Sequence, residues 1–191
     1  MNYNRELLIT GPRVYKILEI SQIISQASIL QGLEVKTAEF TNEPLMFSEI
    51  VHIRMGKEIY SPLIIKNKAD ILVCFEPLLA LELVTQYSSS VSMIILNTHS
   101  ILPFIHQTEQ AISIFEQLAE KIIKVDIFQI AKEAGNINKN NFVMLGILDG
   151  LNILPIDSVN IIKAVEDIVD QHDIINYVKL IEMGKGSASL F

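Results

Sequence analysis

The chain has 191 residues, of which 50% are hydrophobic and 19% are charged, with 15 lysines and arginines against 22 aspartates and glutamates. The hydrophobic fraction excludes a disordered chain, the length favours one domain over two, and the net charge of −7 without a basic block argues against nucleic acid as a partner. The single cysteine, Cys74, excludes an internal disulfide and predicts a reducing compartment.

The first part of the chain predicts a strand, a helix and a second strand. Residues 7–10 are apolar and end at Gly11 and Pro12, which predicts a strand that stops at a turn. Apolar residues recur at steps of three and four over residues 16–31, which predicts a helix that Gly32 ends. A moderate alternation over 33–40 predicts the second strand. A crossover helix between strands favours a mostly parallel sheet.

Short strands and longer helices alternate through the rest of the chain. Residues 50–55 and 58–60 flank a Gly-Lys pair and predict a hairpin, hence some antiparallel pairing. Residues 71–75 predict a buried central strand with Pro77 in the first turn of the next helix, and residues 91–96 repeat that pattern. Further helices are expected over 109–120, 127–134, 140–149, 158–169, with Asp157 as the N-cap, and 174–183.

These elements together predict an α/β fold, a three-layer αβα sandwich on a mostly parallel sheet with some antiparallel pairing. We expect one domain over residues 1–191, with residues from about 185 to 191 fraying.

The mean hydropathy of +0.37 raises the question of a membrane. The longest uncharged stretch, residues 83–108, contains serines, an asparagine and Pro103, so it does not predict a membrane-spanning helix. Residues 1–10 lack the long apolar region of a signal peptide, so we expect a cytoplasmic protein. The surplus of apolar residues favours burial against other subunits, in a homo- or hetero-oligomer.

Polar residues at strand ends are the candidate functional residues. The turn over residues 11–16 stands where a dinucleotide loop would lie, but only Gly11 is present and Pro12 removes a donor, so we expect neither NAD nor FAD to bind. Glu76 and Asn97 follow the two strands that the pattern predicts best, and ligands bind beyond the carboxyl ends of such strands, so these two residues and Gly11 are the candidates for cofactor binding. An equally good interpretation is local: Glu76 favours a helix N-terminus and Asn97 a turn.

Two other groups of residues resemble chemical sites but favour structural explanations. Cys74 lies within an apolar strand, which predicts an inert buried thiol. Asp167, Asp170, His172 and Asp173 lie close together in sequence, but no glycine loop organises them, so a solvated helix end is favoured over a metal site. We therefore expect no catalytic residue and no metal ligand in the chain.

Several segments in order give the chain a family resemblance. They are GLEVKTAE (32–39), HIR (52–54), YSPLI (60–64), ADILVCFEP (69–77), LNT (96–98), Pro103, AKEAGN (131–136), NFVMLG (141–146), LP (154–155) and Asn176. The chain resembles, over essentially its whole length, the gamma subunit of 2-oxoacid:ferredoxin oxidoreductases, and within them the small subunit of indolepyruvate:ferredoxin oxidoreductase.

Two glycine-rich motifs of that family are missing. Of a GxGGQG loop only Gly11 carries over, and residues 43–47 stand in place of an SQRGG segment. Leu45, Met46 and Phe47 would instead form an apolar surface, which makes them candidates for a partner interface, together with Arg54 and Glu76.

The resemblance implies a gamma-type subunit of a complex that oxidatively decarboxylates a 2-oxoacid and passes electrons to ferredoxin. Thiamine diphosphate and [4Fe-4S] clusters are implied on large partner subunits, often with coenzyme A as a substrate, and none of these centres on this chain. The chain would cover the partner's active site and line a path from Glu76 and Asn97. The main alternative is a degenerate paralogue with a regulatory or scaffold role, and an independent nucleotide-binding enzyme is a third, less favoured one.

Overall fold

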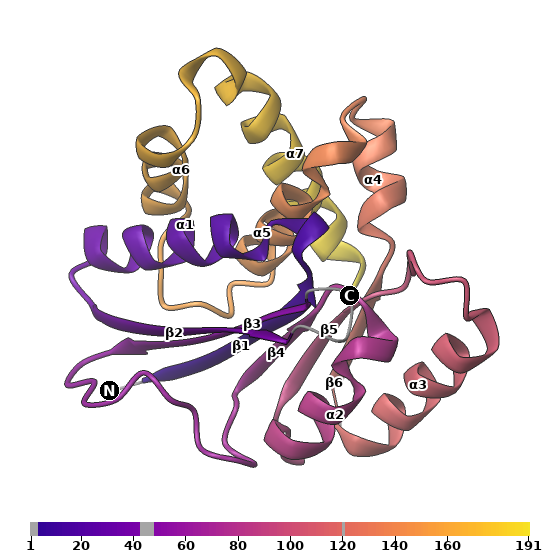
Figure 1. Cartoon of the computed structure of the whole chain (residues 1–191). Coiled ribbons are helices and arrows are strands. Elements are labelled where there is room, and N and C mark those ends of the chain that lie inside the picture. The colour runs from indigo at the N-terminus through magenta and orange to yellow at the C-terminus, as the bar shows by residue number, and fades with distance from the viewer. Residues whose placement is uncertain (1–3, 43–47, 120) are drawn as a thin grey trace.

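The computed structural model describes residues 4–42, 48–119 and 121–191. In these ranges six strands form one sheet in the order β2-β3-β1-β4-β5-β6 (Figure 1). The strands are β1 (Arg5–Pro12), β2 (Glu34–Asn42), β3 (Ser48–Gly56), β4 (Ile71–Cys74), β5 (Met93–Asn97) and β6 (Lys121–Val125). Strands β1, β4, β5 and β6 pair in parallel, whereas β3 is antiparallel to both of its neighbours. The expected α/β fold, with a mostly parallel sheet and some antiparallel pairing, is confirmed.

Strand β3 lies between the two strands that the first crossover connects. Helix α1 (Ile17–Leu30) leads from β1 to β2, but β2 pairs only with β3. The hairpin expected over 50–55 and 58–60 is wrong, because residues 48–56 form one strand and 58–60 form none. Glu58 adopts a left-handed backbone with φ 57°, and the Ile59 N–H donates to the Glu34 carboxylate at 2.9 Å instead of to a strand. The antiparallel pairing is therefore between β3 and its neighbours β2 and β1.

One face of the sheet is covered by α1 and by the C-terminal helices. These helices are α4 (Ile127–Glu133), α5 (Asn140–Gly150), α6 (Ser158–Ile168) and α7 (Ile174–Ser187). Alternate strand residues such as Leu7, Ile9 and Val51 point to this side and join the larger buried cluster, because successive residues of a strand face opposite sides. Figure 1 shows α1 lying above β2 and β3, with α6 packed against α1 on the side away from the sheet and α5 and α7 beyond them.

Glycines allow α5 and α7 to approach closely. A Cβ atom at Gly146 would overlap the carbonyl oxygen of Ile181, and one at Gly184 would overlap that of Val143. Any larger residue at either position would therefore push the two helices apart.

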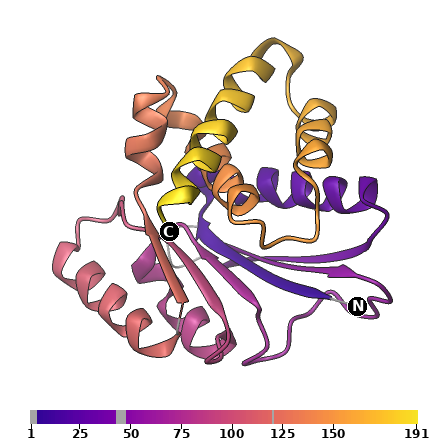
Figure 2. The same cartoon turned by 180° about the vertical axis from the view of Figure 1, so that it is seen from behind.

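The opposite face is covered in two different ways. Helices α2 (Pro77–Tyr87) and α3 (Ile105–Leu118) pack on the half formed by β4, β5 and β6, over a second cluster that includes Leu72, Cys74 and Ile94 (Figure 2). On the other half, the segment of residues 57–70 crosses the sheet, and we call it the strap. It is held by the Arg54 guanidinium, which donates to the Ser61 carbonyl, and by the Ile64 N–H, which donates to the His52 ring.

Several element boundaries differ from the expected ones. Strand β1 continues through Gly11 and Pro12 instead of stopping at Thr10, because both residues pair with the start of β3. Strand β6 was not expected at all. The expected helices are confirmed, although α3 begins at Ile105 and α7 continues to Ser187, followed by the short turn Ala188–Leu190. Fraying of residues 185–191 stays a prediction.

Asp157 occupies the expected N-cap position of α6 but makes no capping hydrogen bond. Its carboxylate instead accepts a hydrogen bond from the Gln31 side chain at 3.1 Å. Among the described residues, no helix combines the length and the apolar character needed to cross a membrane.

Candidate functional site at the carboxyl ends of the strands

The parallel strands β1, β4, β5 and β6 end at one edge of the sheet, and a crevice opens there. Its volume is about 400 Å³. The lining comes from the β1–α1 connection, the loop after β5, the start of α4 and the segment before α5: Val14, Tyr15, Lys16, Ile101, Phe128, Ile137, Asn138 and Asn140. In open α/β sheets this edge is the usual place for a ligand.

The β1–α1 connection packs tightly and does not form an open glycine loop. Gly11 lies within β1, where an added Cβ would come 2.6 Å from the Cβ of Phe75. Arg13, Val14 and Tyr15 form a 3₁₀ turn. Close packing against Phe75 therefore accounts for the glycine without any ligand, and its role in cofactor binding stays a prediction.

Glu76 is buried directly below the crevice, with an exposed fraction of 0%. Its two carboxylate oxygens accept hydrogen bonds from the Ser100 hydroxyl at 2.6 Å and from the Ile101 N–H at 3.0 Å. Burial raises the pKa of this carboxyl above its ordinary value, and the two hydrogen bonds oppose the rise. The carboxylate thus holds the loop after β5 instead of facing solvent, and a place for Glu76 in a partner interface stays a prediction.

Asn97 is also fully buried, at the end of β5. Its amide nitrogen donates to the carbonyls of Phe75 and His99, and its amide oxygen accepts from the N–H groups of His99 and Ile127. These four hydrogen bonds join the ends of β4 and β5 to the start of α4. The structure thus brings Asn97 and Glu76 to the same edge, where both position backbone below the crevice; a direct ligand contact by either stays a prediction.

The aromatic side chains of Tyr15 and Phe128 line the crevice, and the sequence interpretation did not name either as a site residue. Tyr15 is buried and packs on Phe75 at 5.3 Å between ring centroids. Burial, followed by the nearby negative charge of Glu76, raises the pKa of the Tyr15 hydroxyl, so it stays protonated. The rings of His99 and Phe128 stack at 4.2 Å with an interplanar angle of 4°. The only sequence signal was their position just after strands, in the turn that follows β1 and in the segments that follow β5 and β6.

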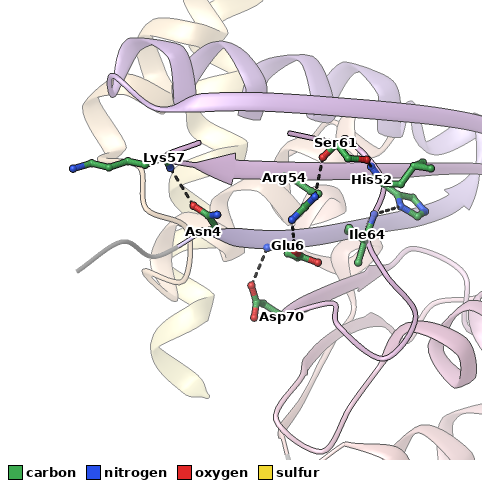
Figure 3. Close-up of polar contacts among 9 residues, drawn as sticks. Asn4, Glu6, His52, Arg54, Lys57, Ser61, Ile64 and Asp70 are labelled. Carbon is green, nitrogen blue, oxygen red and sulfur yellow. Dashed lines mark hydrogen bonds and ion pairs between the residues drawn. The ribbon is translucent and has the colours of Figure 1, made fainter. Parts of the chain in front are cut away.

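The remaining interface candidates fall into two groups. Arg54 lies on β3, where its guanidinium pairs with Glu6 at 2.8 Å and donates to the Ser61 carbonyl at 2.9 Å (Figure 3). It therefore anchors the strap within the chain. Leu45, Met46 and Phe47 lie outside the described residues, so their place in an interface stays a prediction.

Two groups of side chains in the sequence resembled metal-binding or reactive sites, Cys74 and the acidic cluster at residues 167–173. Cys74 is fully buried and burial raises its thiol pKa to about 12, so it does not supply a thiolate ligand. Within the described part of the chain, no three His, Cys, Asp or Glu side chains gather as a metal site. Asp170 instead caps a turn by accepting from the His172 N–H at 3.0 Å, and Asp167 accepts from Gln26.

Comparisons with known proteins find similarity to oxidoreductases that act on 2-oxoacids and to their small subunits. A family model described as pyruvate ferredoxin/flavodoxin oxidoreductase matches residues 11–185. Indolepyruvate oxidoreductase subunit IorB of Archaeoglobus fulgidus is 26% identical over 191 residues, which cover 95% of this chain and 94% of that protein. The subunit of the same name from Methanothermobacter thermautotrophicus is 28% identical over 176 residues, with 87% and 88% covered.

Two solved structures share the fold. The pyruvate oxidoreductase subunit PORC of Thermotoga maritima superposes with a TM-score of 0.69 at 17% identity, covering 96% of each chain. The 2-oxoglutarate:ferredoxin oxidoreductase of Magnetococcus marinus, solved with 2-oxoglutarate, coenzyme A and succinyl-CoA bound, gives a TM-score of 0.79 at 16% identity. That match covers all of this chain but 32% of the other, so the present chain spans about a third of its length.

Proposed function

The chain belongs to the pyruvate ferredoxin/flavodoxin oxidoreductase family, and from this premise we propose that it is the gamma-type, non-catalytic small subunit of a 2-oxoacid:ferredoxin oxidoreductase complex. The observation that carries the proposal is the correspondence with IorB over 95% of this chain and 94% of the relative. A relative that is itself named as a subunit, matched nearly end to end, supports a subunit role over a regulatory or scaffold one.

The complex would oxidatively decarboxylate a 2-oxoacid and pass the electrons to ferredoxin. Iron–sulfur clusters are held by sets of cysteine thiolates, and this chain has one buried cysteine, so its residues do not fit a [4Fe-4S] cluster. The clusters of the complex would therefore lie on partner subunits.

The pair Asp149-Gly150 resembles one part of a thiamine diphosphate-binding motif, but its surroundings do not suit that cofactor. Asp149 lies within helix α5, pairs with Lys185 at 2.9 Å and accepts a hydrogen bond from the Ser158 hydroxyl at 2.6 Å. Its carboxylate is committed to joining α5, α6 and α7. The thiamine centre would also belong to a partner.

This chain would cover the partner's active site with the crevice-bearing edge of its sheet, where the parallel strands end. Apolar side chains rim this edge, with Val14 67% exposed, Phe104 49% and Ile137 38%. Exposed apolar residues around a concave site favour contact with another protein surface. Below them, Glu76 and Asn97 fix the loops that would line a path for the 2-oxoacid or for coenzyme A.

Reconstitution tests the subunit role. The tagged full-length chain would be co-expressed with the large, thiamine- and cluster-binding subunit from the same genome, and 2-oxoacid-dependent reduction of ferredoxin would be measured with and without coenzyme A. Indolepyruvate is the first substrate to test, since the relatives are named for it, followed by pyruvate and 2-oxoglutarate. Activity that requires both chains is expected. A large subunit that is fully active alone, or that does not bind this chain, would refute the proposal.

Surface variants test the proposed face. Val14→Glu and Ile137→Glu place charges in the apolar rim and should weaken assembly measured by gel filtration. Val159→Glu is the matched control, because Val159 is 63% exposed on α6 and does not line the crevice. If all three variants assembled equally well, the interface would have to lie elsewhere on the chain.

A further inference from the structure

A second cavity, of about 420 Å³, lies on the face of the sheet opposite α1, and none of the described residues that line it also lines the crevice. Phe40 and Ile50 of β2 and β3 form one wall, Leu63 of the strap a second, and Leu83 and Tyr87 of α2 a third. Small-molecule sites commonly have volumes of about 300–1,000 Å³ and mostly apolar walls. Size and lining therefore both fit a small ligand.

Three of the residues that line this cavity have aromatic rings that contact one another. The His52 ring lies 5.5 Å from Phe40 with an interplanar angle of 65°, and 5.2 Å from Tyr87 with an angle of 85°. Edge-to-face contacts at such distances are the arrangement that aromatic rings prefer. A planar aromatic guest would extend this arrangement.

The His52 ring also presents one hydrogen-bond donor. Its Nδ1 accepts the Ile64 N–H at 3.1 Å (Figure 3), so in the neutral ring the proton is on Nε2. The residue is 3% exposed, and no side chain or backbone group in the described part of the chain contacts Nε2 by a hydrogen bond. Polar groups inside a protein are normally hydrogen-bonded, so an acceptor on a ligand that enters the cavity would find this N–H free to donate.

We infer that this cavity binds a small, uncharged aromatic molecule that carries a hydrogen-bond acceptor, with the ring between Phe40, Leu83 and Tyr87 and the acceptor on His52 Nε2–H. Among the described residues that line the cavity none is charged, so they would not favour an ionised ligand or steer a charged protein surface to it. The donor is fixed by the bond from the strap, which gives the site a single preferred acceptor position.

Quinoline and naphthalene form a matched pair of probes, because they share size and shape and only quinoline has an acceptor nitrogen. Binding to the full-length chain would be followed by NMR, through the ring nitrogens of His52 and the methyl groups of Leu63 and Leu83. We expect quinoline to shift these signals and to bind about fivefold more tightly than naphthalene, the ratio that one hydrogen bond typically supplies.

Variants that fill the cavity with a larger side chain test whether the ligand binds there. Leu83→Trp should abolish quinoline binding, and Leu63→Trp, at a half-exposed strap position, provides the same test if the first variant does not fold. Ile175→Trp is the control, since Ile175 is 83% exposed on α7, and it should bind as the unchanged protein does. Unfolding by urea would verify that each variant is folded.

Each other outcome overturns the inference. Equal affinities for the two probes would remove the role of His52, and binding that persists in both filled variants would place the ligand elsewhere. If quinoline does not bind the unchanged chain and Leu83→Trp weakens assembly with the large subunit, the cavity is the seat of a partner's side chain instead. None of these results depends on the oxidoreductase activity.

Discussion

Replacement of Glu76 by alanine should lower the free energy of unfolding by about 2–3 kcal/mol. The change leaves the Ser100 hydroxyl and the Ile101 N–H without their acceptors, and a donor that loses its partner in a buried site costs about 1–3 kcal/mol. We take the lower part of the combined range because Ile101 itself is 41% exposed, so water reaches part of this loop. A surface carboxylate would have changed stability by only about 0.5 kcal/mol.

A pair of variants separates hydrogen bonding from charge. Glu76→Gln keeps an acceptor for the Ile101 N–H and can donate to the Ser100 oxygen, so its loss should be under about 1 kcal/mol. Because burial raises the pKa of Glu76 in the folded state, the folded protein holds this proton more tightly than the unfolded chain does. The contribution of Glu76 to stability is therefore greatest below its unfolded pKa and falls as the pH rises through the folded pKa. As the pH rises from the unfolded to the folded pKa of Glu76, the stability of the glutamine variant should therefore increase relative to that of the unchanged protein.

Urea unfolding at several pH values would measure all three proteins. Glu82→Ala, on the exposed side of α2, is the control and should change stability by no more than about 0.5 kcal/mol. A loss in Glu76→Ala as small as that in the control would refute the reasoning, since it would mean that the two hydrogen bonds contribute nothing. A pH-independent difference between Glu76 and its glutamine variant would refute the charge argument alone.

Gly11→Ala should destabilise the chain by about 1–3 kcal/mol, because the added Cβ would come 2.6 Å from the Cβ of Phe75. Gly186→Ala, in the open last turns of α7, should be neutral or stabilising, and thermal unfolding measures both variants. Cys74, buried with a thiol pKa of about 12, should not react with a thiol reagent at pH 8 until the protein unfolds, and rapid labelling of the folded chain would contradict its burial. Burial lowers the pKa of His52, so its contribution to stability should be complete above its ordinary pKa of about 6.5 and decline as the pH falls through the lower folded value. An NMR titration in which His52 protonates at or above that ordinary value would contradict this.

The sequence predicted the layers well because they depend on local patterns. Apolar spacing in helices such as α1 and the continuous run over residues 71–75 follow directly from burial on one face or on both. The position of β3 could not be read in the same way, since it depends on which strands pair across many residues. Strand β6 was missed because its two lysines and its position at the edge of the sheet make it less apolar than a central strand.

The sequence predicted where the site lies but only part of what its residues do. The rule that strand ends meet at one edge correctly brought Glu76 and Asn97 together. Their burial was not predictable, because it depends on the loop after β5 folding back so that Ser100 and Ile101 reach the carboxylate. Tyr15 and His52 were missed because their roles depend on rings from distant elements, Phe75 for Tyr15 and Tyr87 for His52, which the local sequence does not reveal.

The position of β3 between β1 and β2 also determines when the sheet begins to form during synthesis. The first 42 residues contain β1, α1 and β2, yet neither strand has a partner among them, because β2 pairs only with β3 and β1 pairs with β3 and β4. A nascent chain that has not reached Gly56 therefore carries two strands with unpaired backbone, one of them apolar. The pairing therefore predicts that the sheet begins to form only after β3 emerges and completes a three-stranded antiparallel unit, with β4, β5 and β6 pairing later. Until then the two strands present unpaired backbone groups to other chains, which exposes the nascent chain to aggregation.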